Sequence, residues 1–320
     1  MVLNRTQQTI LAIIDKDARL SHSEISKQSK IPKSVVTYNL NNLIKSGVIK
    51  GFATLVDHSS LGYSELRVYL NLYENNLERE NQFIEYLTAM KNTSIVVLCI
   101  GNYDLIVNFY VRNIQYFWKQ WFEVLKLYRS IIKDYAFNII VEKDLFPFFP
   151  GMQNRIEKTY VIGNRKAEEV DEMDRKLLNL LNNDCRRPLF EIANILKMSS
   201  SSVIYRIRKL EEKKVILGYY TIFNFEKLKK EFFRVQFQFE EVNPLEDFIN
   251  LLKVSGKVLG FSKIIGSFND LEVDILVDDI EGLISFVNEI RQKFPGFIRD
   301  YRYLHITETH KWNHNPEAEE

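Results

Sequence analysis

The sequence predicts an α+β fold in which one module occurs twice, a winged helix-turn-helix unit followed by a ferredoxin-like β-α-β-β-α-β domain. Three observations support this prediction: a gapless internal repeat, a change from helical to strand periodicity inside each copy, and a basic excess in the first part of each copy. The 320 residues suit two to four domains better than one.

The repeat is the strongest signal. A shift of 167 residues aligns 3–68 with 170–235 without a gap, and 17 of the 66 pairs are identical, where unrelated sequences would share roughly four. Further on, Asp104-Leu105 corresponds to Asp270-Leu271. The repeat predicts helix-turn-helix domains at 1–60 and 170–228, ferredoxin-like domains at 61–150 and 229–312, and a linker at 151–169.

Each copy begins with three short helices. Apolar residues around 9–14 have helical spacing, Ser23 is expected to cap the second helix, and Ser34 the third. Both turns place a lysine, Lys30 or Lys197, where glycine often eases a left-handed residue. We expect that substitution to cost about 1 kcal/mol if the geometry is used.

The third helix of each copy has an apolar inner stripe and a polar, basic outer face, as in DNA-reading helix-turn-helix units. Residues 1–56 carry a net charge of +5 and residues 171–219 a net charge of +3, which favours phosphate contact over the alternative of a solvated three-helix core. Lys50 is a further phosphate candidate. The predicted DNA-binding residues are Lys33, Ser34, Thr37, Tyr38, Asn41, Asn42, Lys45, Ser201, Tyr205, Arg206, Arg208 and Lys209.

The second part of each copy alternates as strands do. In the first copy we expect strands at 66–73, 94–100, 105–111 and 134–142, with helices at 80–90 and 115–130. The second copy repeats this order over 233–307. The helix-free face of each sheet needs cover, which we expect from pairing with a second copy. Trp118 and Phe122 lie beside the inner stripe of their helix, and are interpreted either as a contact with another domain or subunit, or as a wider core.

Other motifs argue for a cytoplasmic protein without catalytic, metal or cofactor sites. Cys99 and Cys185 lack a CxxC partner and are expected to be reduced. No signal peptide is recognised, and the apolar window 95–111 is too interrupted to span a membrane. His310 and His314 have a loose metal-ligand spacing, but the tail is expected to be frayed.

The segment DEMDRKLL at 171–178, Arg186, the run LEEKKVILGY at 210–219 and the turn IGNYDL at 100–105 resemble the Lrp/AsnC (feast/famine) regulators. The chain is about twice the length of a single member, so it looks like a fused double form. The resemblance implies RAM-type sensor domains, which pair through their sheets, and paired helix-turn-helix units on double-stranded DNA. It also implies an amino acid-like effector near the glycine-containing turns, at Gly101, Asn102, Tyr103, Asp104, Gly266 and Asp270. The second turn departs from the pattern by one extra residue.

The expected partners are thus DNA, a small effector, and either the other half of the chain or a second copy. A rival from another class is an enzyme, because siroheme decarboxylases resemble the same modules. Such an enzyme should line its cleft with histidines, whereas the sensor halves offer only His305 and the tail histidines, and the third strands carry Asn108 and Asp274. A third alternative is an interaction protein that no longer binds DNA. Steep salt dependence of DNA binding would distinguish a DNA-binding regulator from such a protein.

Overall fold

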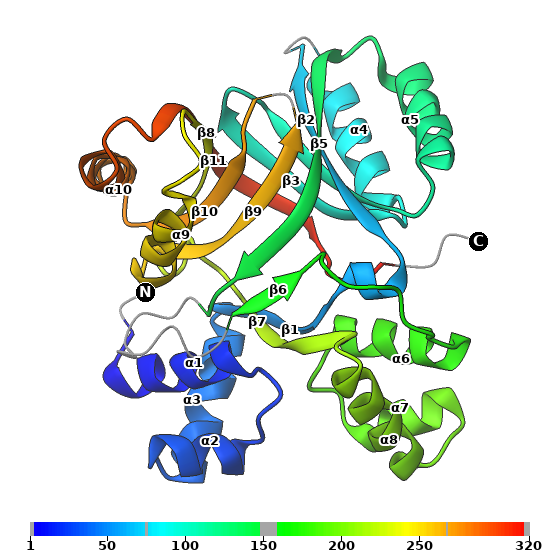
Figure 1. Cartoon of the computed structure of the whole chain (residues 1–320). Coiled ribbons are helices and arrows are strands. Elements are labelled where there is room, and N and C mark those ends of the chain that lie inside the picture. The colour runs from blue at the N-terminus through cyan, green and yellow to red at the C-terminus, as the bar shows by residue number, and fades with distance from the viewer. Residues whose placement is uncertain (1–2, 74–75, 148–158, 267, 317–320) are drawn as a thin grey trace.

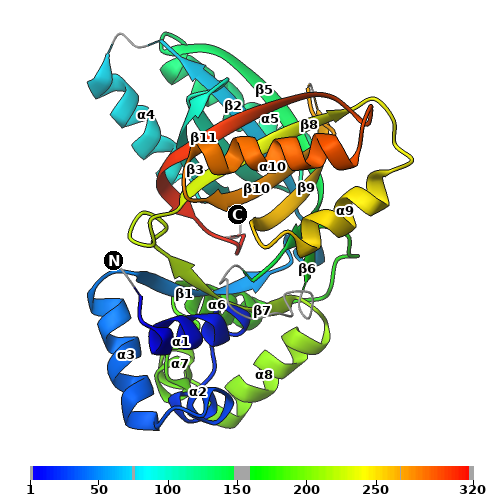
Figure 2. The same cartoon turned by 90° about the vertical axis from the view of Figure 1, so that its left-hand side faces the viewer.

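The computed structural model describes residues 3–73, 76–147, 159–266 and 268–316 (Figures 1 and 2). Two helix-turn-helix units lie side by side at one end of the molecule, and all remaining long strands form a barrel at the other end. The elements of the first copy are α1 (Arg5–Lys16), α2 (His22–Ser29), α3 (Lys33–Lys45), β1 (Ile49–Val56), η1 (His58–Leu61), β2 (Ser64–Leu72), α4 (Leu77–Ala89), β3 (Thr93–Gly101), β4 (Leu105–Val111), α5 (Ile114–Tyr128) and β5 (Ile132–Leu145).

The second copy repeats this order without a 3-10 helix. Its elements are α6 (Glu172–Asn183), α7 (Leu189–Leu196), α8 (Ser200–Glu212), β7 (Ile216–Phe223), β8 (Glu231–Phe239), α9 (Leu245–Val254), β9 (Val258–Gly266), β10 (Leu271–Val277), α10 (Ile280–Lys293) and β11 (Ile298–Trp312). Between the copies, β6 (Tyr160–Ile162) pairs with β5 inside the segment expected to be a linker. Residues 151–158 of that segment lie outside the described residues.

Helix starts differ from the expected caps. Ser21, not Ser23, caps α2, in a capping box with Glu24, because both reciprocal hydrogen bonds to the helix backbone then form. Pro32 precedes α3, so Ser34 lies inside the helix and is not its cap. Lys30 and Lys197 do adopt left-handed φ values of 57° and 54°, which confirms the strained geometry expected of both turns.

The two helix-turn-helix units are interlocked across the repeat. Strands β1 and β7 pair antiparallel in a two-stranded sheet, and the first helix of each unit ends against the strand of the other. Two equivalent hydrogen bonds hold this exchange: the hydroxyl of Thr54 donates to the carbonyl of Leu181, and that of Thr221 donates to the carbonyl of Ile14, each over 2.9 Å. The predicted pseudo-dimer therefore exists within one chain.

The two ferredoxin-like sheets join at their edges and close into an eight-stranded barrel with the order β2-β4-β3-β11-β8-β10-β9-β5, completed by pairing of β5 with β2. The seams between copies are β3–β11 and β5–β9. Helices α4 and α5 lie outside one half and α9 and α10 outside the other (Figures 1 and 2). Each helix-free face is thus covered by the other copy, as expected, and the two faces form the interior of one barrel.

Apolar cores fill the space between each half-barrel and its helices, as the alternation of Leu66, Val68 and Leu70 on β2 requires. Trp118 and Phe122 are outside these cores: their side chains are 61% and 44% exposed and stack on each other. The wider-core interpretation is therefore wrong for these two rings. Their contact with another subunit stays a prediction.

The C-terminal segment is docked, so the expectation of a frayed tail is wrong for residues up to 316. His314 is buried against the ring of Tyr220, and Asn313 accepts a hydrogen bond of 2.8 Å from Asn182 on α6. The segment bonds to the barrel as well, through the N–H of Asn313 and the carbonyl of Ser94. Among the described residues, no group of His, Cys, Asp and Glu side chains could hold a metal ion.

Candidate functional site

Helices α3 and α8 lie at the end of the molecule away from the barrel (Figures 1 and 2). Tyr38 and Tyr205, which are equivalent in the repeat, are both 67% exposed. Asn41 and Arg208, also equivalent, are exposed one turn further along. The other exposed predicted residues are Lys33, Ser34, Lys45, Lys50, Ser201 and Lys209, whereas Thr37 and Asn42 are half-buried.

Arg206 differs from the other predicted DNA-binding residues because it is held inside its own unit. Its Nη1 atom lies 2.7 Å from a carboxylate oxygen of Asp171 and 2.6 Å from one of Asp174, at the start of α6. The hydrogen bonds to Asp171 and Asp174 raise the pKa of the Arg206 guanidinium. This arginine therefore fixes α8 on α6, and we omit it from the residues that could hold phosphate.

The two predicted effector turns are built by their aspartates. Asp104 accepts a hydrogen bond of 2.8 Å from the N–H of Leu72, and Asp270 accepts one of 2.9 Å from the N–H of Phe239. Because each carboxylate binds the backbone of the neighbouring strand, both aspartates stabilise the turn itself. They are less available to a ligand than the sequence suggested.

The two glycines of these turns lie at the seams of the barrel. A Cβ atom on Gly101, at φ +144°, would lie 2.6 Å from the carbonyl oxygen of Tyr303, and one on Gly266 would collide with the side chain of Asn138. Glycine thus permits the close approach of the two copies. Asn102 is exposed, and the ring of Tyr103 packs against that of Tyr69 at 4.9 Å, which links the first turn to the barrel interior.

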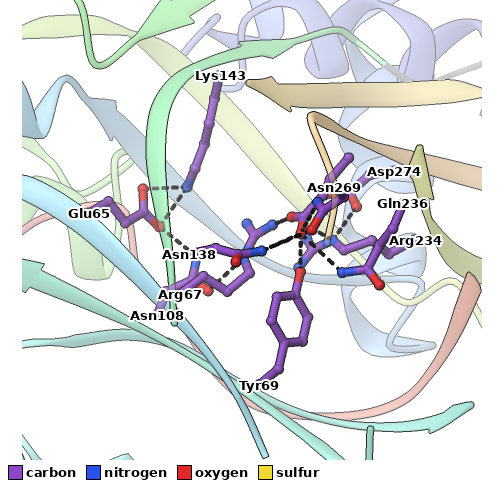
Figure 3. Close-up of polar contacts among 11 residues, drawn as sticks. Glu65, Arg67, Tyr69, Asn108, Asn138, Lys143, Arg234, Gln236, Asn269 and Asp274 are labelled. Atoms are coloured by element: carbon purple, nitrogen blue, oxygen red, sulfur yellow. Dashed lines mark hydrogen bonds and ion pairs between the residues drawn. The ribbon is translucent and has the colours of Figure 1, made fainter. Parts of the chain in front are cut away.

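A charged cluster fills part of the barrel interior, and we call it the barrel cluster (Figure 3). Its members come from both copies and, with the exception of the partly exposed Asp274, are almost completely buried. They are Glu65, Arg67, Tyr69, Asn108, Asn138, Lys143, Arg234, Gln236, Asn269, Glu272 and Asp274.

One part of the barrel cluster is centred on Glu65, near the start of β2 (Figure 3). Its carboxylate receives hydrogen bonds from Lys143 at 2.6 Å and from the amide of Asn108 at 2.5 Å. Burial alone would raise the pKa of Glu65, but the ammonium of Lys143 lowers it to about 2, so the carboxylate is charged. His58, from η1, lies 3.8 Å from the same carboxylate.

The other part is centred on Glu272, which pairs with Arg67 across the copies. Glu272 also accepts hydrogen bonds from Tyr69, from Gln236 at 3.2 Å and from Asn269 at 2.8 Å. Arg234 forms a two-bond pair with Asp274 of its own copy, at 2.7 and 2.9 Å. Such pairing is what makes buried charge tolerable.

Sequence reasoning missed most of this cluster. Glu65, Arg67 and Tyr69 alternate with apolar residues along β2, and that alternation is also typical of a strand with one face in water. His58 was missed because it lies outside every predicted helix or strand. The available signal was that arginine occurs at the equivalent positions 67 and 234 of the repeat. Arginine is almost never fully buried unless it is paired, so this signal is weak evidence for a buried ion pair.

Two family models match the chain. An AsnC-type helix-turn-helix domain matches residues 170–211, and a winged helix-turn-helix DNA-binding model matches residues 3–50. An uncharacterized HTH-type transcriptional regulator of Pyrococcus horikoshii is 30% identical over 148 residues, which is 44% of this chain and 90% of that protein. The transcriptional regulator AzlB of Bacillus subtilis is 26% identical over 116 residues, which is 36% of this chain and 74% of that protein.

The fold and these matches define a class, that of winged helix-turn-helix proteins with ferredoxin-like sensor domains, present here as an internal pair. Within that class, the chain belongs to the Lrp/AsnC family.

Solved structures of a two-module protein match nearly the whole chain. The crystal structure of the siroheme decarboxylase NirDL has a TM-score of 0.64, covers 96% of this chain and 92% of its own, and is 16% identical in sequence. At this identity the likeness shows a shared two-module fold and carries no information about chemistry. No helix among the described residues is long and apolar enough to cross a membrane.

Proposed function

We propose that the protein is a cytoplasmic transcription regulator that binds double-stranded DNA sequence-specifically through α3 and α8. The observation that carries the proposal is that two exposed, polar and basic helix faces lie at the same end of the molecule (Figure 1). The shared β1–β7 sheet holds them in one geometry. Paired helix-turn-helix units of fixed geometry read two half-sites on DNA.

The half-sites should have unlike sequences, because the two reading faces differ. Asn41 offers a side chain suited to adenine, whereas the equivalent Arg208 offers one suited to guanine. Binding selection from random DNA should therefore return an asymmetric site. A perfectly palindromic site would contradict this assignment of reading residues.

Arg208→Ala is the sharpest variant. We expect it to weaken binding by about 1–3 kcal/mol and to relax one base preference, because a bidentate contact to guanine would be lost. The matched control is Lys293→Ala on α10, which removes a cation from the opposite end of the molecule. Gel shifts across a salt series test both, since affinity that depends on phosphate contacts must fall steeply as salt rises. No binding at low salt would overturn the proposal and favour an interaction protein.

We also propose that the turn 101–104 binds a small amino acid-like effector. Asn102 and Tyr103 are the residues available for such a contact, because Asp104 is bonded to the strand backbone. A melting-temperature screen against free amino acids tests the idea, with Asn102→Ala as the variant that should lose the response. A shift that persists in Asn102→Ala would place the effector elsewhere.

The second candidate function is siroheme decarboxylation. Its support is the shared two-module fold, and the presence of two buried imidazoles, His58 and His314, that sequence reasoning did not place in the barrel region. Against it, every carboxylate and cation of the barrel cluster is paired within the cluster, which leaves little free positive charge for a polyanionic tetrapyrrole. Incubation with siroheme and measurement of porphyrin absorbance decides between the two: a changed spectrum with loss of carboxylate supports the enzyme.

A further inference from the structure

Each half of the barrel contains one buried charge that its own residues do not neutralise, and the two charges have opposite signs. In the first half, Lys143 neutralises Glu65, and Arg67 is left with the uncharged amide of Asn108 as its own-copy partner. The corresponding partner in the second half is charged. There, Arg234 lies near two carboxylates of its own copy, Asp274 at 2.7 Å and Glu272 at 4.0 Å, so one negative charge is left in excess.

The contact that neutralises both charges is the ion pair between Arg67 and Glu272. The equivalent contact, from Arg234 of the second copy to the first copy, would need a carboxylate in the first copy and is not formed. Strand register makes Arg67 opposite Asn108 equivalent to Arg234 opposite Asp274. The residue equivalent to Glu272 is then Ile106, two positions before Asn108.

Like pairings would bury a net charge in a closed barrel. Two first halves would place both copies of Arg67 against Ile106, with no carboxylate for either. Two second halves would contain two copies of Arg234 and two copies each of Asp274 and Glu272. Four carboxylates would then face two arginines. The unlike pairing has three cations and three carboxylates and is neutral. An unpaired buried charge is among the most destabilising features that a protein interior can contain.

We propose that the Arg67–Glu272 pair selects the partner of each half, so that a first half closes a barrel only with a second half, from the same chain or from another. Each barrel is then an obligate unlike pair of one first half and one second half. Like-with-like assembly through these sheets is excluded. This inference concerns pairing of the sensor halves and does not depend on DNA binding.

Two full-length variants remove one charge each and keep side-chain size: Arg67→Met and Glu272→Gln. Each should lower the melting temperature by about 4–7 °C, because the remaining charge is buried without its partner. The double variant in one chain should recover at least half of that loss. The matched control is the exposed pair Arg299–Glu240 on the same barrel, where Arg299→Met and Glu240→Gln should each change the melting temperature by less than about 2 °C.

Partner choice is measured by producing the Arg67→Met chain and the Glu272→Gln chain together. The two chains differ in mass, so native mass spectrometry distinguishes their complexes. Exchange of halves would unite the Arg67→Met sheet with the Glu272→Gln sheet, and restore the wild-type pair in the other barrel. We expect mixed two-chain complexes in clear excess over like ones, and a recovered melting temperature. A statistical mixture, or a double variant as unstable as the sum of the single ones, would overturn the proposal. If neither single variant folds, recovery of the double variant still supports it and failure of the double variant overturns it.

Discussion

The crossed threonine hydrogen bonds allow a prediction whose size follows from the structure. The carbonyl of Leu181 lies in the last turn of α6, where its usual donor would be the N–H of Cys185. That N–H is bonded to the carbonyl of Phe52 instead, at 3.1 Å. The fully buried hydroxyl of Thr54 is therefore what satisfies Leu181.

Thr54→Val keeps the shape of the side chain and removes the donor. A buried carbonyl left without a donor costs about 1–3 kcal/mol. With an unfolding entropy of about 2.1 cal/mol/K per residue, the 320 residues give about 0.7 kcal/mol/K if the chain melts as one unit. The melting temperature should then fall by about 3 °C. Thr221→Val should have the same effect, and the double variant about twice the effect, because the two bonds are separate.

Differential scanning calorimetry measures the change, with Thr9→Val as the control. The hydroxyl of Thr9 bonds to the carbonyl of Arg5 on the surface of α1, so its loss should cost much less. If Thr54→Val melts at the wild-type temperature while Thr9→Val does not, the exchange between copies does not contribute the stability assigned to it.

Three further predictions follow from burial and backbone geometry. Cys99 and Cys185 should resist iodoacetamide in the native protein at pH 8 and react after denaturation, because burial raises the pKa of both thiols to about 12; rapid native labelling, followed by mass spectrometry, would contradict this. Burial lowers the pKa of His314 to about 3, so the unfolded chain binds the extra proton, and stability should fall as pH drops from about 6.5 towards 3; denaturant midpoints of His314→Gln should depend less steeply on pH. Lys30→Gly and Lys197→Gly should each stabilise the chain by about 0.5–1 kcal/mol in urea unfolding, because glycine adopts a left-handed φ without strain; a lower midpoint would refute this.

Local patterns in the sequence predicted the elements well where their consequences are local. The strand 105–111 has the predicted bounds, because alternation is set by side chains within the segment. The repeat predicted two copies of one module. It could not show that Thr54 and Thr221 would bond across the copies, since identical residues at equivalent positions fit separate modules equally well.

The interior of the barrel was beyond prediction for a related reason. A polar residue at every second position of β2 fits a water-facing strand as well as one that faces a charged interior. Only the closure of the sheet at β3–β11 and β5–β9 decides between them. The role of Asp104 and Asp270 in building their turns was hidden likewise, because a carboxylate in a turn suits a ligand and a backbone N–H alike.

The one-directional pair of Arg67 and Glu272 has a genetic consequence. Two similar coding segments in one gene are substrates for gene conversion, which copies a tract from one segment over the other. A tract that carried the codon of Ile106 into position 272 would delete the carboxylate that pairs with Arg67, although it would replace one homologous residue by another. Selection should therefore keep the two segments different at this position while it keeps their common framework alike.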